Sequence, residues 1–165
     1  MSDRRKQFLD TLEKEHARTM RVLRAYPAGQ EDFRPHPKAR TAKEVATPLW
    51  AGQSLLLRGV TTGFDWSKPP SPPKPPATIA ELADEVEKAH RQIVETLGNV
   101  EDASLDETVR FMVAPKTLGD FRKIDFLWFA LLDHVHHRGQ LSVYLRTAGA
   151  KVPSIYGPSG DEPWF

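Results

Sequence analysis

Apolar residues recur every three or four positions in four separate segments of this chain. This period is typical of amphipathic α-helices, and it predicts helices over about residues 3–25, 42–60, 79–97 and 118–148. The rest of the sequence contains no run that we interpret as a strand. Because each helix must bury its apolar face against another element, the pattern predicts an all-α four-helix bundle. The length suits a single domain over residues 1–165.

Threonines mark the starts of three predicted helices, because each is followed three residues later by an acidic residue. In this capping box the hydroxyl and the carboxylate bond the free backbone N–H groups of the first turn. Pro48 lies inside the second predicted helix, where it predicts a kink or a loosened first turn. The expected boxes are Thr41 with Glu44, Thr78 with Glu81, and Thr117 with Asp120.

A proline-rich run over residues 68–76 separates the second and third predicted helices. Nine residues of polyproline II extend roughly 28 Å, and the helix before them also rises roughly 28 Å. A connection of this length favours parallel second and third helices. We therefore expect an up-down-down-up order with a long proline-rich crossover between helices two and three. A solvated linker that carries a ligand motif for another domain is the alternative.

Two further segments are expected to pack on the bundle. Residues 109–113 lie in the long loop over 99–116, and we expect them to form a lid over one end rather than a strand. The tail over residues 152–165 is rich in proline and aromatic side chains. Since a disordered tail would leave those aromatic rings in water, we expect it to dock across the bundle or a partner subunit.

The composition excludes some classes of binding partner and limits the residues that could hold a metal. The chain has 23 lysines and arginines against 22 aspartates and glutamates, so it lacks the positive excess that nucleic-acid or anionic-membrane binding normally uses. No segment approaches the roughly 20 apolar residues of a membrane span. There is no cysteine, so a metal must be held by His, Asp, Glu or water. These features exclude nucleic-acid and membrane partners and favour a cytoplasmic location.

The fourth predicted helix carries the strongest candidate site, because residues 133–140 hold three of the six histidines. Asp133 and His137 are four residues apart, which places both side chains on one helix face and allows them to share a metal ion. His16 is the candidate third ligand, since it lies mid-helix on an apolar stripe of a helix expected to run beside the fourth. His134 points about 100° away and is expected to face a neighbouring helix or a dimer partner. Of the remaining histidines, His36 and His90 are interpreted as loop and surface residues, and His136 as a solvent-exposed or interfacial residue.

Two other interpretations of Asp133 and His137 stay open: a buried, hydrogen-bonded pair, and a metal-free acid/base site in which the aspartate orients the imidazole. Gln140 continues the same face and is expected in a second shell or at the substrate. Gly139 is expected to allow close approach by a neighbouring helix. Further residues expected in the second shell or the cavity are Tyr144, Arg138, Trp50 and Gln53.

The C-terminal third of the sequence resembles the DinB/YfiT-like family. The resemblance rests on His136-His137-Arg138-Gly139-Gln140-Leu141, then Tyr144-Leu145-Arg146, Gly149, Val152-Pro153 and Tyr156-Gly157-Pro158. Residues 33–38 and 40–46 are similar to the family's approach to its second helix. The resemblance implies an up-down-down-up four-helix bundle, frequent homodimers, and a divalent metal, often nickel or zinc, held by three side chains. It also implies, for some members, S-transferase or isomerase reactions with a low-molecular-weight thiol; many members have no assigned activity.

The resemblance places the family's metal ligands only in part. His137 matches the last ligand, and Asp133 stands where the family more often has His or Glu. Pro48 stands where the second helix should supply a histidine, and proline cannot bind a metal. Two functions therefore stay open. One is a divalent-metal-binding protein of thiol S-transferase or hydrolase-like type acting on a small molecule, and the other is a non-catalytic dimeric binding or scaffold protein that has lost the metal.

Overall fold

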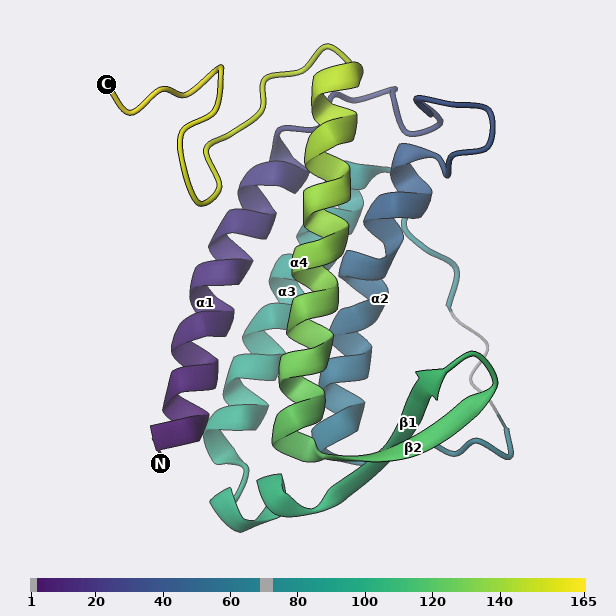
Figure 1. Ribbon diagram of the computed structural model, residues 1–165, viewed down its shortest axis with the longest axis vertical. Coiled ribbons are helices and arrows are strands. Elements are labelled where there is room, and N and C mark those ends of the chain that lie inside the picture. The colour runs from purple at the N-terminus through teal and green to yellow at the C-terminus, as the bar shows by residue number, and fades with distance from the viewer. Residues whose placement is uncertain (1–2, 69–72) are drawn as a thin grey trace.

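Four long helices form the body of the molecule in the computed structural model, which describes residues 3–68 and 73–165 (Figure 1). The prediction of a four-helix bundle is confirmed. The first three helices begin at the predicted residues and end within two residues of the predicted ends. The helices are α1 Asp3–Arg24, α2 Ala42–Val60, α3 Ile79–Asn99 and α4 Lys123–Thr147.

Two of the three expected capping boxes are present. The Thr41 hydroxyl accepts a hydrogen bond from the Glu44 backbone N–H at 3.1 Å, and the Glu44 carboxylate accepts one from the Thr41 N–H at 2.7 Å. The box of Thr78 and Glu81 starts α3 in the same way. These reciprocal bonds explain why the sequence predicts both helix starts correctly.

The predicted start of the fourth helix is wrong, and so is the expectation that no strand occurs. Strand β2, Thr117–Arg122, contains the third expected box and pairs antiparallel with β1, Thr108–Ala114. Helix α4 begins only at Lys123, and no side chain caps it. The hairpin is stabilised by packing, because rings from both strands lie against Phe126 of α4.

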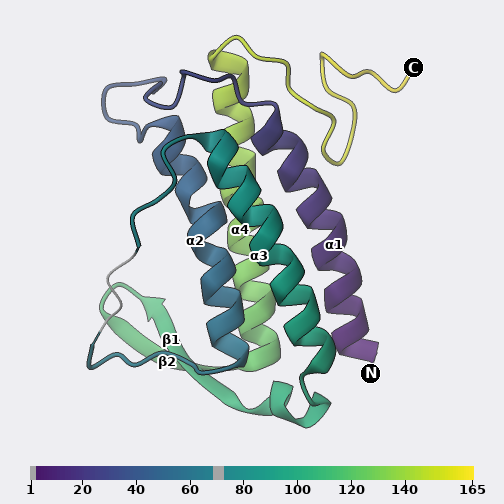
Figure 2. The same ribbon diagram turned by 180° about the vertical axis from the view of Figure 1, so that it is seen from behind.

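The helices pack as a square in which α1 and α2 occupy one diagonal and α3 and α4 the other. In Figure 1 the chain ascends α1 and α4 and descends α2 and α3, and Figure 2 shows the same arrangement from behind. Lys43, at the start of α2, donates a hydrogen bond to the Ala77 carbonyl just before α3 at 3.0 Å. The starts of α2 and α3 therefore lie together. Residues 69–72 of the expected proline-rich crossover lie outside the described residues.

A polar layer divides the core into two apolar clusters. On each helix, buried or largely buried polar side chains lie between apolar residues that belong to the two clusters. They form the middle of the bundle. The residues of this polar layer are Glu15, His16, Thr19, Gln53, His90, His134 and Arg138.

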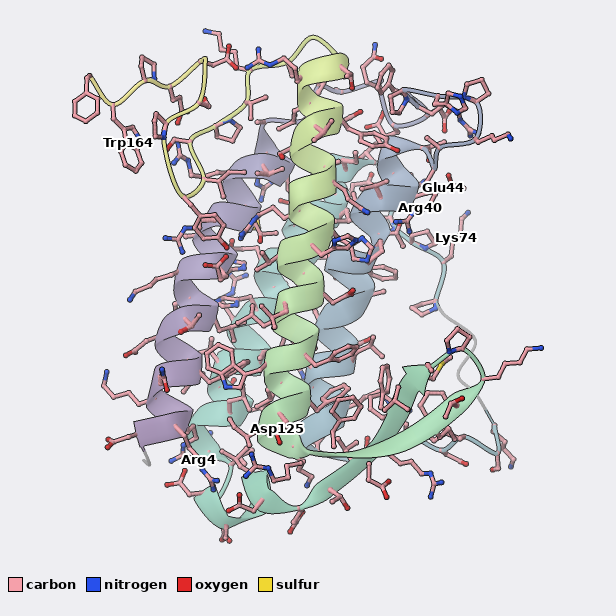
Figure 3. The ribbon with its side chains drawn as sticks, viewed as in Figure 1. Arg4, Arg40, Glu44, Lys74, Asp125 and Trp164 are labelled. Atoms are coloured by element: carbon pink, nitrogen blue, oxygen red, sulfur yellow. The ribbon has the colours of Figure 1, made fainter. Side chains whose placement is uncertain are left out.

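The C-terminal tail docks on this chain's own bundle, which was one of the two expected positions. Arg18 and Arg21 of α1 donate hydrogen bonds to the carbonyls of Ile155 and Ser154, at 3.2 and 2.8 Å. Within the tail, the Trp164 indole N–H donates to the Ser154 hydroxyl at 2.9 Å (Figure 3). In the part of the chain that the structure describes, no helix has the length and apolar character needed to cross a membrane.

Candidate functional site

Asp133 and His137 lie one turn apart on α4, as expected from their spacing. The distance between Asp133 Oδ2 and His137 Nε2 is 3.6 Å. The aspartate side chain is 51% exposed, whereas that of the histidine is 12% exposed. The pair is therefore neither fully buried nor joined by a normal hydrogen bond, and one side of it is open to solvent.

Gln140 determines which nitrogen of His137 carries the hydrogen. The Arg40 guanidinium, which can only donate, bonds Gln140 Oε1 at 3.3 Å. His137 Nδ1 lies 3.2 Å from the same oxygen, so Nδ1 must donate its hydrogen to it. The Gln140 amide nitrogen in turn donates to His136 Nε2 at 3.0 Å. A neutral His137 therefore has its free lone pair on Nε2, on the side of Asp133.

Two hydrogen-bond acceptors thus face each other across 3.6 Å, the carboxylate of Asp133 and the imidazole Nε2 of His137. Such atoms repel unless a positive charge lies between them, either a proton on Nε2 or a metal cation. Ligand atoms held 2.0–2.2 Å from one tetrahedral ion are roughly 3.4 Å apart. The observed separation therefore fits two ligands of a single ion.

Tyr144 holds this arrangement in place from the next turns of α4. Its hydroxyl donates to the Arg40 carbonyl at 2.9 Å. Arg40 immediately precedes the capped start of α2, which Figure 3 shows beside α4. A chain of hydrogen bonds therefore runs from Tyr144 through Arg40 and Gln140 to His137. It links the orientation of the imidazole to the packing of two helices.

The structure does not bring His16 to the pair. Its ring stacks on His90 of α3, with 3.6 Å between the ring centres and 1° between the planes. His16 Nε2 also lies 3.1 Å from the Glu87 carboxylate. Burial, and the neighbouring His90, hold the pKa of His16 below its ordinary value. Within residues 3–68 and 73–165, no group of three His, Asp or Glu side chains is arranged to hold a metal.

The expectation that His90 lies on the surface is wrong, because this residue is only 5% exposed. The sequence contains the signal, since Val86, His90 and Ile93 follow one another at helical spacing. The neighbouring Lys88 and Arg91 are exposed, while His90 itself stacks on His16 of α1.

Arg138 lies on the far side of α4 from Asp133, where it forms a buried ion pair and hydrogen bonds. Its side chain is 1% exposed and pairs with the Glu15 carboxylate of α1 at 2.7 Å. Arg138 also donates to the Tyr156 hydroxyl, which donates in turn to Glu15 at 2.6 Å. Although burial acts to raise it, the hydrogen bonds from Tyr156 and Arg138 hold the pKa of Glu15 below its ordinary value. Arg138 therefore joins α4, α1 and the tail.

The remaining expected cavity residues lie elsewhere. Trp50 and Gln53 line a groove of about 480 Å³ between α2 and α3, and not the pocket beside Asp133. Gln53 is buried in the polar layer, where its Oε1 has no hydrogen-bond partner. Gly139 does not allow close helix approach as expected, because a Cβ atom there would meet nothing within 4 Å.

A separate pocket of about 160 Å³ opens beside Asp133, between α2, α4 and β1. Sequence reasoning did not find it, because one wall comes from the hairpin. His134 of α4 lies in another part of the lining and is buried. Burial lowers its pKa to about 4, so the imidazole is neutral at pH 7. Its Nε2 has no hydrogen-bond partner and lies against Gly52 of α2, where a Cβ atom would be only 2.1 Å away. His134 thus faces a neighbouring helix, which was one of its two expected positions.

Comparison with known proteins identifies one family and one relative. The model of the DinB family matches residues 1–163. The uncharacterized protein YrdA of Bacillus subtilis (strain 168) is 34% identical over 82 residues, which cover 49% of this chain and 46% of that protein. The match thus spans about half the length of this relative.

Two solved structures share the fold. A DinB-like protein from Bacillus cereus ATCC 10987 is 24% identical, with a TM-score of 0.76, over 92% of this chain and 97% of that chain. YfiT from Bacillus subtilis, described as a probable metal-dependent hydrolase with an unusual four-helix bundle topology, is 14% identical. Its TM-score is 0.64, over 92% of this chain and 91% of that chain. At these identities the likeness concerns the fold alone.

Proposed function

Because this chain belongs to the DinB family, we propose that it is a divalent-metal-dependent protein of hydrolase type, with Asp133 and His137 as two metal ligands. The observation that carries the proposal is the pair of acceptor atoms that face each other across 3.6 Å. The description of YfiT as a probable metal-dependent hydrolase supports the reaction class.

The donor set favours nickel or zinc, since an imidazole with a carboxylate suits either ion. A divalent ion at this pair would act as a Lewis acid that polarises a carbonyl or phosphoryl group. Two protein ligands leave further coordination positions open to solvent or substrate, as catalytic sites require. They also make the ion easy to remove.

The chain's own contribution to this site is orientation. Gln140 accepts the Nδ1 hydrogen of His137 and so keeps the Nε2 lone pair toward Asp133. Arg40 fixes the direction of the Gln140 amide and brings a positive charge to the edge of the site. Substitution of Gln140 should therefore weaken metal binding without removing a ligand.

The proposal includes the up-down-down-up helix order with a crossover from α2 to α3. The contact between Lys43 and Ala77 supports it. The contacts of Gly52 with His134 and of Gly59 with Phe126 support an antiparallel α2 and α4. This order is what places Arg40, at the start of α2, beside the later turns of α4.

The experiments described below also test two other functions. A thiol S-transferase reaction would use the same metal pair with a low-molecular-weight thiol as substrate. A non-catalytic binding or scaffold role is favoured by Pro48, which offers no ligand from α2, and by the absence of a three-residue metal group among the described residues.

Metal content tests the proposal. The protein, purified without an affinity tag, is dialysed to equilibrium against NiCl2 or ZnCl2, and its metal content is measured against that of the dialysis buffer. We expect about one ion per chain, and loss of that ion in both His137→Ala and Asp133→Asn. His36→Ala, which changes an exposed loop histidine, serves as the matched control and should keep the ion.

The reaction class is tested on the metal-loaded protein. Hydrolysis of p-nitrophenyl esters that His137→Ala abolishes would support a hydrolase. Conjugation of glutathione to monochlorobimane with release of chloride, in place of ester hydrolysis, would support the S-transferase. A wild-type protein that retains no more metal than His137→Ala overturns the proposal and favours the non-catalytic role.

A further inference from the structure

The pocket beside Asp133 is built mainly from aromatic rings. Phe126 and Phe129 come from α4, and Phe111 comes from β1. The rings of Phe111 and Phe126 are 5.0 Å apart and nearly perpendicular, and those of Phe111 and Phe129 are 6.2 Å apart. Aromatic rings in these geometries attract a further ring through edge-to-face contact. The lining therefore favours an aromatic guest over a polar one.

The hairpin holds the Phe111 wall in position. The Trp66 indole N–H donates to the Arg110 carbonyl at 2.9 Å. Phe64, from the segment after α2, packs on Phe111 with 5.0 Å between ring centres. Contacts from the segment after α2 thus support the wall, so the pocket exists before any ligand binds.

The size of the pocket limits its occupant. Its volume is about 160 Å³. A buried apolar cavity of about 150 Å³ is sufficient to bind one benzene molecule. The pocket accommodates a single six-membered ring and excludes fused rings.

One polar side chain in the lining is accessible to a ligand. Asp133 lines the pocket with a half-exposed carboxylate, whose oxygens accept hydrogen bonds. Nε2 of His134 makes no hydrogen bond, but it is buried against Gly52 and offers no surface to a ligand. The site thus combines an apolar interior with one accessible hydrogen-bond acceptor, the Asp133 carboxylate.

We propose that this pocket binds a single aromatic ring that carries a hydrogen-bond donor, an O–H or N–H group, with the ring against Phe111 and Phe129 and its donor at the Asp133 carboxylate. The ring would belong to the substrate, and its binding would place the adjoining carbonyl at Asp133 and His137. This last step rests on the proposed function. Ring binding itself does not.

The test uses metal-free wild-type protein and 4-fluorophenol as the probe, followed by fluorine NMR titration. We expect saturable binding that is about tenfold tighter than binding of 6-fluoro-2-naphthol, which is too large for the pocket. Fluorobenzene, which lacks the hydroxyl, should also bind more weakly than 4-fluorophenol, because it cannot donate a hydrogen bond to the Asp133 carboxylate.

Two variants locate the binding site. Ala130→Leu fills the pocket and should weaken 4-fluorophenol binding about tenfold or more. Val143→Leu adds a carbon on the exposed part of the same helix and should leave binding unchanged. Since Ala130 is nearly buried, circular dichroism checks that its variant folds. Phe129→Ala, at a 42% exposed position, is the second variant and should admit the naphthol.

The outcomes separate the two proposals. Metal uptake without saturable 4-fluorophenol binding overturns the ring pocket and leaves the metal site standing. Saturable ring binding in a protein that takes up no metal supports the pocket and overturns the metal-dependent function. Equal weakening by Ala130→Leu and Val143→Leu, or binding of the naphthol as tight as that of the phenol, also overturns the pocket.

Discussion

Gly52 of α2 lies directly against the imidazole of His134 of α4, so close that a Cβ atom at Gly52 would be 2.1 Å from His134 Nε2. Two turns further along α2, Gly59 approaches Phe126 in the same way, with a Cβ atom 2.1 Å from the ring. The two glycines therefore set the spacing of α2 and α4, the helices between which the aromatic pocket lies.

Substituting Gly52 with alanine should destabilise the protein. The added methyl group overlaps a buried ring that must move, a kind of overpacking that costs about 1–3 kcal/mol. Gly139→Ala is the matched control, because a Cβ atom there meets nothing within 4 Å. Because alanine is more favourable than glycine in a helix interior, Gly139→Ala should raise the free energy of unfolding by about 0.5–1 kcal/mol. Urea unfolding of both variants measures the difference, and a stabilised Gly52→Ala would show that the two helices are not held this close.

The buried network of Arg138 and Glu15 leads to a second prediction. Arg138→Met removes the fully buried partner of a carboxylate that is 8% exposed and leaves it with Arg18 and Tyr156. The variant should lower the free energy of unfolding by up to about 3–5 kcal/mol. The double variant Arg138→Met with Glu15→Gln should recover part of the loss, because no buried carboxylate then lacks its Arg138 partner and Arg18 is exposed enough to be hydrated. Thermal or urea unfolding measures both.

An exposed ion pair provides the control for this network. Lys6 and Asp10 form one four residues apart on the surface of α1. Lys6→Met should leave the free energy of unfolding nearly unchanged, because water screens an exposed pair. If Arg138→Met is as mild as Lys6→Met, the network does not join α4 to α1 and the tail as described.

Helix capping gives a third prediction, which separates a true cap from a false one. Thr41→Ala removes the hydroxyl that accepts a hydrogen bond from the Glu44 N–H, and it should lower the free energy of unfolding by about 1 kcal/mol. Thr117→Ala removes a hydroxyl from a strand, where it caps no helix, and should change stability by less than about 0.5 kcal/mol. Chemical unfolding compares the two, and equal losses would contradict a start of α4 at Lys123.

The contrast between these threonines shows how far sequence predicts this fold. Capping and apolar periodicity act within a few residues, so they identify α1, α2 and α3 correctly. The hairpin depends on pairing between Val109 and Phe121 and on packing against Phe126. These contacts join residues 12 and five positions apart on different elements, which no helical repeat relates, and the local pattern around Thr117 satisfies a helix start equally well.

The same contrast between local and long-range contacts applies to the candidate site. Asp133 and His137 lie on one helix, so their proximity follows from a spacing of four residues. The position of His16 depends on how α1 rotates against α3, which placed it on His90 instead of the pair. The aromatic pocket needs three elements at once, and no single segment contains its pattern.

The burial of His134 predicts how stability depends on pH. Its pKa in the folded state is about 4, because burial disfavours the charged form, against 6.5 as the ordinary value. The unfolded chain therefore binds a proton at a higher pH than the folded chain. This contribution to stability is fully present above about pH 6.5, falls as the pH is lowered toward 4, and is constant below that. The loss is at most about 3 kcal/mol.

Comparison with a variant isolates this contribution from that of the carboxylates. The quantity to measure is the free energy of unfolding of wild type minus that of His134→Gln, from urea titrations between pH 7 and pH 4. We expect this difference to decrease as the pH falls, because the wild type loses stability when the unfolded chain protonates His134. The variant has no imidazole to protonate. His36→Gln, on an exposed loop, should keep the full wild-type slope. If His134→Gln keeps that slope too, His134 takes up its proton as readily in the folded protein as in the unfolded chain, and the wall of the aromatic pocket is open to water.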